Sequence, residues 1–261
     1  MAIAHVHTDT YTDNASAPAT LNIVLPTGVA STDIVILVIG SDNSGSLVGS
    51  YTAPSGWTLI GQVLNVGNSA NWVSAQAWWA LGSVGNLGFT KNTPASQCGS
   101  VCACFSGVDN TTPIDVTGTA NSNTGASSGT VAAMTIATAN AWVLVGSADW
   151  LGGSQTITNF TKSENAAANA SACLNYDTTP FGTGSTGTFT LNDSAGTSGQ
   201  VLIWIPFALR PASGTFQGDE EGITYSSRMV WKHKQPGFPR LNRKWFNTES
   251  GLYLPRKDVA A

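Results

Sequence analysis

Histidine and carboxylate side chains near the start of the chain are the first candidates for chemistry. His5 and His7 lie two residues apart, so a regular strand would place both rings on one face, where Asp9 could join them as a metal ligand. The sequence indicates no third anchored ligand elsewhere. We therefore expect surface or interface histidines, with no metal and no other cofactor. His233 stands between two lysines, a setting that suits contact with an acidic surface.

Two glycine-rich stretches match the letters of catalytic motifs but not their structural context. Residues 182–187 match the dinucleotide fingerprint, which works by pointing a helix N-terminus at a pyrophosphate, yet the sequence continues as a strand. Residues 125–129 match the nucleophile elbow, which also needs a following helix. Paired carboxylates for glycoside hydrolysis are set by distance in space, and nothing here selects a pair. We expect a protein that is not an enzyme.

Four cysteines lie in strand-like sequence. Cys98, Cys102 and Cys104 share parity, so one regular strand would turn all three to the same side, too close together to bridge one another comfortably. The sequence leaves two alternatives. The favoured one is buried, reduced thiols that act as small apolar groups; the other is a disulfide from Cys173 to one of the three, which would need an oxidising compartment.

Tryptophans could stack sugar rings on exposed indoles. The residues that could do this are Trp57, Trp72, Trp78 and Trp150. Residues 72–81 alternate, with aromatic side chains on both faces of the expected strand, so the second face must be covered or must bind something. We favour packing between two sheets, whereas exposed platforms would suit carbohydrate binding.

The elements that must position these residues are strands. The 261 residues include 28 glycines and only 10% charged residues, and helix formers are scarce beside Thr, Val, Ser, Gly and Asn. We predict an all-β fold with a β-sandwich or jelly-roll-like body. The expected strands are 3–11, 20–26, 32–41, 57–66, 70–81, 87–91, 98–106, 130–138, 141–149, 155–161, 168–177, 186–192 and 200–210. Pro206 predicts an edge or a bulge in the last of them.

Two of these strands resemble each other. Residues 33–42 and 140–149 are each a continuous apolar run that ends in small residues and an aspartate. The likeness could reflect two sheets with equivalent central strands, or two strands that meet the same demand for burial. We favour the second explanation, because one ten-residue likeness is weak support for a repeat.

The middle of the chain carries a buried strand and then a turn. Residues 98–105 are small, apolar and partly β-branched, and Gly107, Asp109, Asn110 and Pro113 are turn formers. The sequences FSGVD (105–109), TPID (112–115) and PSGWTLI (54–60) resemble a β-sandwich module that recurs in structural proteins of tailed bacteriophages. The resemblance covers residues 1–211 and implies a fold and a virion setting, without an active site.

Charge divides the chain in two. Residues 1–209 hold two basic and ten acidic residues, whereas residues 210–261 hold nine basic and five acidic ones. We predict a sandwich body over 1–211 and a basic, aromatic-rich, mostly irregular anchoring arm over 212–261. Its candidate partner-binding residues are Arg228, Trp231, Lys232, Arg240, Arg243, Lys244, Trp245, Phe246 and Tyr253. Protein is favoured over nucleic acid as the partner, because three acidic residues at 219–221 interrupt the basic run.

These patterns lead to one functional expectation and one alternative. The N-terminus lacks the basic and apolar regions of a secretory signal, and the longest apolar run, 34–40, is too short to span a membrane. We expect a virion structural protein, made in the host cytoplasm and exposed as capsid decoration, cement or a head or tail projection. It would bind other virion proteins and form a homo-oligomer, with a trimer favoured. The alternative is a carbohydrate-binding adhesin module that recognises host surface glycans.

Overall fold

Strands are the only regular secondary structure in the part of the chain that the structure describes. The computed structural model describes residues 1–13, 20–43, 49–68, 71–85, 87–92, 97–166, 171–194, 201–213, 245–247 and 253–255. Every regular element in these ranges is a strand, which confirms the all-β prediction. A search of the same residues for a helix long and apolar enough to cross a membrane finds none.

The first half of the chain forms lobe 1 from eight strands. They are β1 (Ala4–Asp13), β2 (Thr20–Asn22), β3 (Ile34–Asn43), β4 (Tyr51–Thr52), β5 (Trp57–Asn68), β6 (Asn71–Leu81), β7 (Gly88–Lys91) and β8 (Gln97–Ser106). A five-stranded antiparallel sheet has the order β1-β8-β3-β6-β5, and a three-stranded sheet has the order β2-β7-β4.

The second half forms lobe 2. Its strands are β9 (Ile114–Thr117), β10 (Asn121–Thr124), β11 (Ser128–Val131), β12 (Thr135–Ile136), β13 (Trp142–Asp149), β14 (Gln155–Ile157), β15 (Lys162–Ala166), β16 (Ser171–Tyr176), β17 (Gly184–Ser185), β18 (Phe189–Asp193) and β19 (Val201–Leu209). The large sheet has the order β10-β19-β13-β16-β15, with β9 also paired to β19. A three-stranded sheet has the order β11-β18-β14, and β12 pairs with β17.

The two lobes have the same topology. We number the strands of each lobe from one to eight, counting β9 and β10 together as one interrupted strand and leaving out β12 and β17. The large sheets of both lobes then have the same order, first-eighth-third-sixth-fifth. The small sheets share the order second-seventh-fourth. This is the strand order of a jelly roll in which the fifth strand has joined the large sheet. The likeness between residues 33–42 and 140–149 therefore reflects equivalent central strands, β3 and β13, and the explanation that we favoured from sequence is wrong.

Local details repeat as well. The rings of Trp57 and Phe89 lie 5.1 Å apart at 71° in lobe 1, and those of Phe160 and Phe189 lie 5.0 Å apart at 73° in lobe 2. Trp57 and Phe160 each follow a residue with positive φ, Gly56 at 94° and Asn159 at 74°. Glycine and asparagine are the residues that adopt this conformation most readily. The two lobes therefore share turns and aromatic contacts as well as strand order.

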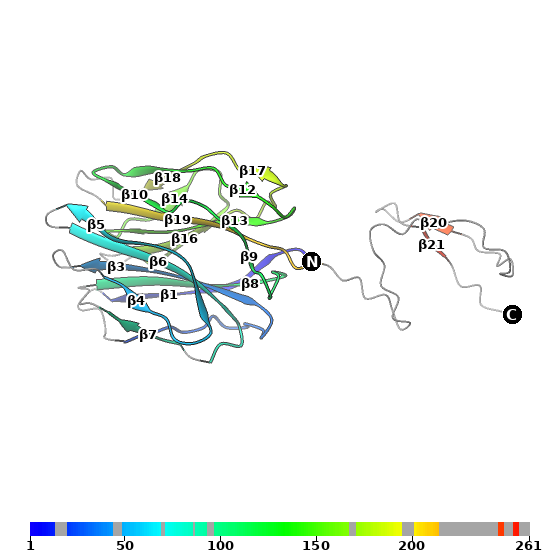
Figure 1. The fold of residues 1–261 in the computed structure, drawn as a ribbon, viewed down its shortest axis with the longest axis horizontal. Helices are drawn as coiled ribbons and strands as arrows, with labels where there is room; N and C mark the ends of the chain where they lie inside the picture. The colour runs from blue at the N-terminus through cyan, green and yellow to red at the C-terminus, as the bar shows by residue number, and fades with distance from the viewer. Residues whose placement is uncertain are drawn as a thin grey trace. The chain divides into compact units, whose positions relative to one another are not determined.

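The large sheets pack face to face and form the main core of the body (Figure 1). Alternate residues of each central strand enter this core, for example Ile36 and Val38 from β3 and Leu144 from β13. Their neighbours Leu37 and Val145 face the small sheet of their own lobe. Figure 1 shows the resulting layers, with β4 and β7 beneath the large sheets and β14 and β18 above them. Every central strand is buried on both faces, as continuous apolar sequence indicates.

The contacts between the lobes follow a twofold pattern. Contact of β3 with β16 is matched by contact of β13 with β6, and contact of β8 with β16 by contact of β19 with β6. At the margins, contact of β1 with β15 is matched by contact of β5 with β10. Equivalent surfaces of the two lobes thus meet each other, as in an isologous dimer interface.

Glycines let the sheets approach closely at the centre of this interface. A Cβ on Gly40 of β3 would clash with the carbonyl oxygen of Ser171 and lie 3.0 Å from the Cβ of Ala148. A Cβ on Gly146 of β13 would lie 2.9 Å from Cγ2 of Val38. Each central strand therefore carries a glycine where the opposite lobe leaves no room for a side chain.

Pro206 lies inside the large sheet of lobe 2, and not at an edge. It pairs with Val145 of β13 on one side. On the other side it lies where the neighbouring strand breaks between β9 and β10, and its carbonyl accepts a hydrogen bond from the Gly118 amide at 2.8 Å. The Pro206 nitrogen, which has no hydrogen to donate, therefore faces the break between β9 and β10, where no backbone hydrogen bond of the sheet is lost. An interior strand can accommodate a proline in this way.

The chain divides into two compact units, residues 1–214 and 215–261. The end of the first unit is bound to its beginning, because the Met1 amino group donates to the Ala212 carbonyl at 2.9 Å. It is also bound to the turn after β8, because the Ala212 amide donates to the Gly107 carbonyl at 2.8 Å. In the second unit, β20 (Trp245–Asn247) pairs antiparallel with β21 (Tyr253–Pro255). This hairpin is the described part of the arm that the sequence predicts to be mostly irregular.

Gly40→Ala should destabilise the body by about 1–3 kcal/mol, the usual cost of adding a methyl group to a closely packed core. Gly182→Ala is the matched control, because a Cβ there meets no atom within 4 Å and its φ is not in the left-handed region. Thermal or urea unfolding of both variants measures the difference. Equal stabilities would contradict the close approach of the two sheets.

Candidate functional site

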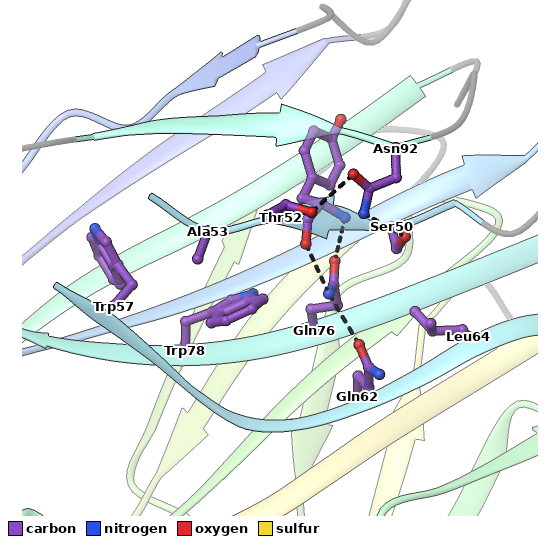
Figure 2. Close-up of a pocket in the computed structure, with 10 residues that line it drawn as sticks. Ser50, Thr52, Ala53, Trp57, Gln62, Leu64, Gln76, Trp78 and Asn92 are labelled. Carbon is purple, nitrogen blue, oxygen red and sulfur yellow. Dashed lines mark hydrogen bonds between the residues drawn. The ribbon is translucent and has the colours of Figure 1, made fainter. Parts of the chain in front are cut away.

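A pocket lined by several polar side chains lies in lobe 1, beside β4 (Figure 2). Its volume is about 390 Å³, within the range of small-molecule sites, about 300–1,000 Å³. Strands β5 and β6 supply one wall, and β4 with the residue after β7 supplies the other. The lining residues are Ser50, Tyr51, Thr52, Ala53, Trp57, Gln62, Leu64, Gln76, Trp78 and Asn92. None of them carries a charge.

Gln76 connects the two walls. Its Oε1 accepts the Tyr51 amide at 2.7 Å, and its Nε2 donates to the Tyr51 carbonyl at 3.2 Å and to Oε1 of Gln62 at 3.1 Å (Figure 2). Gln76 is buried, so these bonds replace the water that its amide loses. The network also orients the exposed Gln62, whose Oε1 is used as an acceptor while its Nε2 is left to donate.

Asn92 holds the other end of the pocket. Its Oδ1 accepts the Thr52 hydroxyl at 2.9 Å, and its Nδ2 donates to the Ser50 hydroxyl at 3.2 Å. Its backbone amide also donates to the Ser50 carbonyl at 2.9 Å. Figure 2 shows Ser50 and Asn92 at one end of the pocket and both tryptophans at the other. The pocket thus has a polar end and an aromatic end.

The aromatic end brings together two of the four tryptophans singled out from sequence. Trp57 and Trp78 both pack edge-to-face on Phe89, with ring centroids 5.1 and 5.8 Å from it. Trp57 is only 8% exposed, so it packs in the core of lobe 1, as favoured from sequence, and does not form the alternative, an open stacking platform. Trp78 is half-buried, and its Nε1 is enclosed by protein, so carbon surface of the indole is what remains open.

The other two tryptophans are not part of this pocket. Trp72 begins the alternating part of β6, six residues from Trp78, and Trp150 packs against the core between the lobes. Both are half-buried. The predicted packing of aromatic residues on both faces of β6 is confirmed, because Trp79 packs on the core between the lobes and Trp78 on the core of lobe 1.

A second hollow of about 580 Å³ lies beside the loop after β6. It is lined by Ser55, Gly56, Trp79, Leu81, Ser83, Val84 and Gly85. Two serines are its polar side chains, and no histidine, cysteine or carboxylate lines it. This hollow therefore offers less chemistry than the first.

The expected pairing of His5 and His7 on one face is wrong. His5 pairs with Phe105 and His7 with Cys104, so Val6 is an extra residue in a β-bulge, and the two histidines point to opposite faces. The His5 ring enters the core region between the lobes, 5.6 Å from Phe105 and 5.3 Å from Tyr176, where burial lowers its pKa. Within the described ranges, no group of three His, Cys, Asp or Glu side chains could hold a metal.

All four cysteines are buried free thiols. Cys98 and Cys102 lie in the core between the sheets of lobe 1, whereas the Cys173 sulfur lies 3.3 Å from the Gln155 carbonyl on the small-sheet side of lobe 2. Both large sheets separate them, so the alternative of a Cys173 disulfide is wrong. Burial raises the pKa of the Cys104 and Cys173 thiols to about 12, which keeps them protonated and unreactive.

The turn that carries the phage resemblance joins lobe 1 to lobe 2. Gly107 has a φ of 71°, and a Cβ there would collide with the Ala2 carbonyl. Asp109 accepts the Thr111 and Thr112 amides at 2.9 and 3.1 Å, bonds that lower the pKa of its carboxyl. The motif residues thus have structural roles, as their turn chemistry predicts.

Arg210 fastens this connection to the last strand of the body. Its Nε donates to Asp115 at 3.3 Å and its Nη1 to the Thr112 hydroxyl at 2.9 Å, while its backbone amide donates to the Pro113 carbonyl. Arg210 lies inside the compact unit of residues 1–214 and within the body bounds of 1–211 predicted from sequence. Asp115 also accepts the amides of Ala137 and Thr138 at 2.8 and 3.1 Å.

Most of the predicted partner-binding residues of the arm lie outside the described residues. These are Arg228, Trp231, Lys232, Arg240, Arg243 and Lys244. The backbones of Trp245, Phe246 and Tyr253 belong to the β20–β21 hairpin, in which Phe246 pairs with Leu254 and Asn247 with Tyr253.

The two glycine-rich stretches have the strand context expected of them. Residues 182–187 include β17, and residues 125–129 lead into β11, so neither is followed by the helix that its catalytic motif requires.

Sequence reasoning missed the amides of the pocket, although signals for them exist. Gln76 is an uncharged polar residue in the middle of an apolar strand, which indicates a buried hydrogen-bonding role. Asn92 ends the sequence FTKN (89–92), which recurs in lobe 2 as FTLN (189–192). That recurrence also marks the duplication.

Asp115→Asn should destabilise the body near neutral pH by about 1–3 kcal/mol, because a buried charged acceptor is lost. Burial alone would raise the pKa of Asp115, but the hydrogen bonds from Thr138 and Ala137 and the Arg210 charge lower it below its ordinary value. Because folding lowers the pKa of this carboxyl, its ionised form stabilises the fold above about pH 4. This stabilisation is lost as the pH falls through the folded-state pKa. Urea unfolding from pH 3 to 7 should therefore show the variant and the parent converging in acid.

Asp9→Asn serves as the control. Asp9 is 40% exposed and its Oδ1 lies 4.0 Å from Nε2 of His7, so this pair should contribute little to stability. A constant difference between the Asp115 variant and the parent down to pH 3 would contradict the role assigned to Asp115.

A scan against protein-family models finds no match for this chain, and searches of curated proteins and of solved structures find none either.

Proposed function

We propose that this chain is a structural protein of a bacteriophage virion, exposed on the particle as capsid decoration, cement or a head or tail projection. The observation that carries the proposal is the division of the chain into two unlike units. Residues 1–214 hold three basic and ten acidic residues, whereas residues 215–261 hold eight basic and five acidic ones together with seven aromatic residues. The body is the exposed part, and residues 215–261 anchor it.

The chemistry of the body supports a structural role. The turn that resembles the phage module is shaped by hydrogen bonds to Asp109 and is tied to the end of the last strand of the body through Arg210, Thr112 and Asp115. The buried thiols have raised pKa values, and His5 packs among aromatic rings. Jelly rolls recur in viral capsid and lectin domains, so the topology is compatible with the proposal at the level of fold analogy.

The anchoring segment would bind another protein of the particle. Its arginines and lysines suit an acidic rim, and its aromatic side chains suit apolar grooves, which are the residue types that dominate interface energies. The acidic residues at 219–221 make nucleic acid the less suitable partner.

Homo-oligomer formation remains part of the proposal, with different support. Strands with two apolar faces would favour an oligomer if one face were open, but here both faces are covered inside the chain, by the other lobe and by the small sheets. The proposed oligomer, with a trimer favoured, therefore depends on the anchoring segment and not on the large sheets.

Removal of residues 215–261 should leave the body folded, with an unchanged far-ultraviolet β signal, and should abolish its incorporation into particles. Substitution of Arg240, Arg243 and Lys244 by Gln in the full chain should weaken incorporation in the same direction. Gln at the body lysines 91 and 162 is the control and should leave incorporation unchanged. Quantitative mass spectrometry of purified particles gives the occupancy. Truncated body at full occupancy would refute the anchoring role.

A further inference from the structure

The duplication provides an internal reference for the pocket of lobe 1. The hydrogen bond between Thr52 and Asn92 has a counterpart between Thr158 and Asn192, whose Nδ2 donates to the threonine hydroxyl at 3.2 Å. The aromatic pairs after the left-handed turns also correspond. These shared contacts belong to the common framework, so they do not by themselves indicate a ligand.

The register of the central strands aligns the rest of the pocket. We align Gly40 of β3 with Gly146 of β13. Gly40 pairs with Ala75 in lobe 1 and Gly146 pairs with Leu174 in lobe 2, so Ala75 corresponds to Leu174. One residue further, Gln76 corresponds to Asn175, a second buried amide.

The side chains that open onto the pocket do not correspond. Continuing the same alignment, Trp78 of lobe 1 corresponds to Asp177 of lobe 2. Gln62, the cross-strand partner of Gln76, corresponds to Ser163, the partner of Asn175. Lobe 1 therefore adds an indole surface and a long neutral amide to a framework that folds without them in lobe 2.

The added groups suit one class of ligand. An indole carbon surface packs against an apolar ring face, and Gln62 Nε2, Thr52 Oγ1 and Asn92 Nδ2 offer a mixture of donors and acceptors. The lining contains no charged side chain, and the body around it is acidic, so phosphate or carboxylate groups have no ionic partner there. A saccharide without charge has the required combination of an apolar ring face and hydroxyl groups.

We propose that lobe 1 binds a neutral saccharide in the pocket bounded by Trp78, Gln62, Thr52 and Asn92. Trp78 packs against one face of a sugar ring, and Gln62 donates to a hydroxyl. Gln76 is a positioning residue, because both of its N–H groups and its oxygen are already bonded and it acts by orienting Gln62. This activity would hold whether or not the chain belongs to a virion.

The test uses the full chain and a panel of neutral probes: the methyl glycosides of glucose, galactose, mannose and N-acetylglucosamine, with maltose and cellobiose. Isothermal titration and saturation-transfer NMR measure binding, and glucuronic acid is the charged comparison. We expect saturable binding of at least one neutral probe and at least about tenfold weaker binding of glucuronic acid, a difference of about 1.4 kcal/mol.

Equivalent positions of lobe 2 supply variants that separate a loss of binding from a loss of folding. Gln62→Ser introduces the residue found at the equivalent position of lobe 2 and should weaken binding at least about tenfold, while the variant keeps a cooperative unfolding transition. Asn92→Ala should also weaken binding, whereas Asn192→Ala, its counterpart, should not. The absence of saturable binding by every neutral probe would overturn the proposal, and so would equal affinity of the Gln62→Ser variant and the parent.

Discussion

The packing of the large sheets of the two lobes against each other is the contact on which the rest of the body depends. It buries alternate residues of β3 and β13, and it requires glycine at 40 and 146 because the sheets approach too closely for a Cβ. The other face of each sheet covers the core of its own lobe. Each lobe alone would expose a large apolar sheet to water, so the lobes stabilise each other through burial that neither could achieve separately.

The twofold arrangement also separates structural residues from functional candidates. Features that occur in both lobes, such as the Thr–Asn hydrogen bond and the aromatic pair after a left-handed turn, serve the common framework. Features found in one lobe call for another explanation. Trp78 and Gln62 are of this kind, because Asp177 and Ser163 occupy their places in lobe 2 without loss of the topology. The most informative positions of a duplicated fold are those at which its halves differ.

Sequence patterns predicted the class of fold and most long strands, because burial on two faces leaves a continuous apolar record. They missed β15, whose residues KSENA form a polar edge strand, and they misplaced His5 and His7, because a bulge at Val6 leaves no mark in composition. The pocket could not be predicted as a site, because it depends on Gln76 bridging from β6 to β4 across two sheets. Of its residues, only Trp57 and Trp78 stood out in the sequence, and Trp57 proved to be buried.

Native-state hydrogen exchange tests the central claim, that the two lobes form one cooperative body through their large sheets. The amides of β3 and β13 lie at the centre of that contact, one in each lobe. We predict that both sets exchange only through global unfolding, with free energies of opening that agree with each other and with the denaturant-derived stability. If the β13 amides exchanged through an opening of much lower free energy while β3 stayed protected, the lobes would be independent, and the account of a shared core would be contradicted.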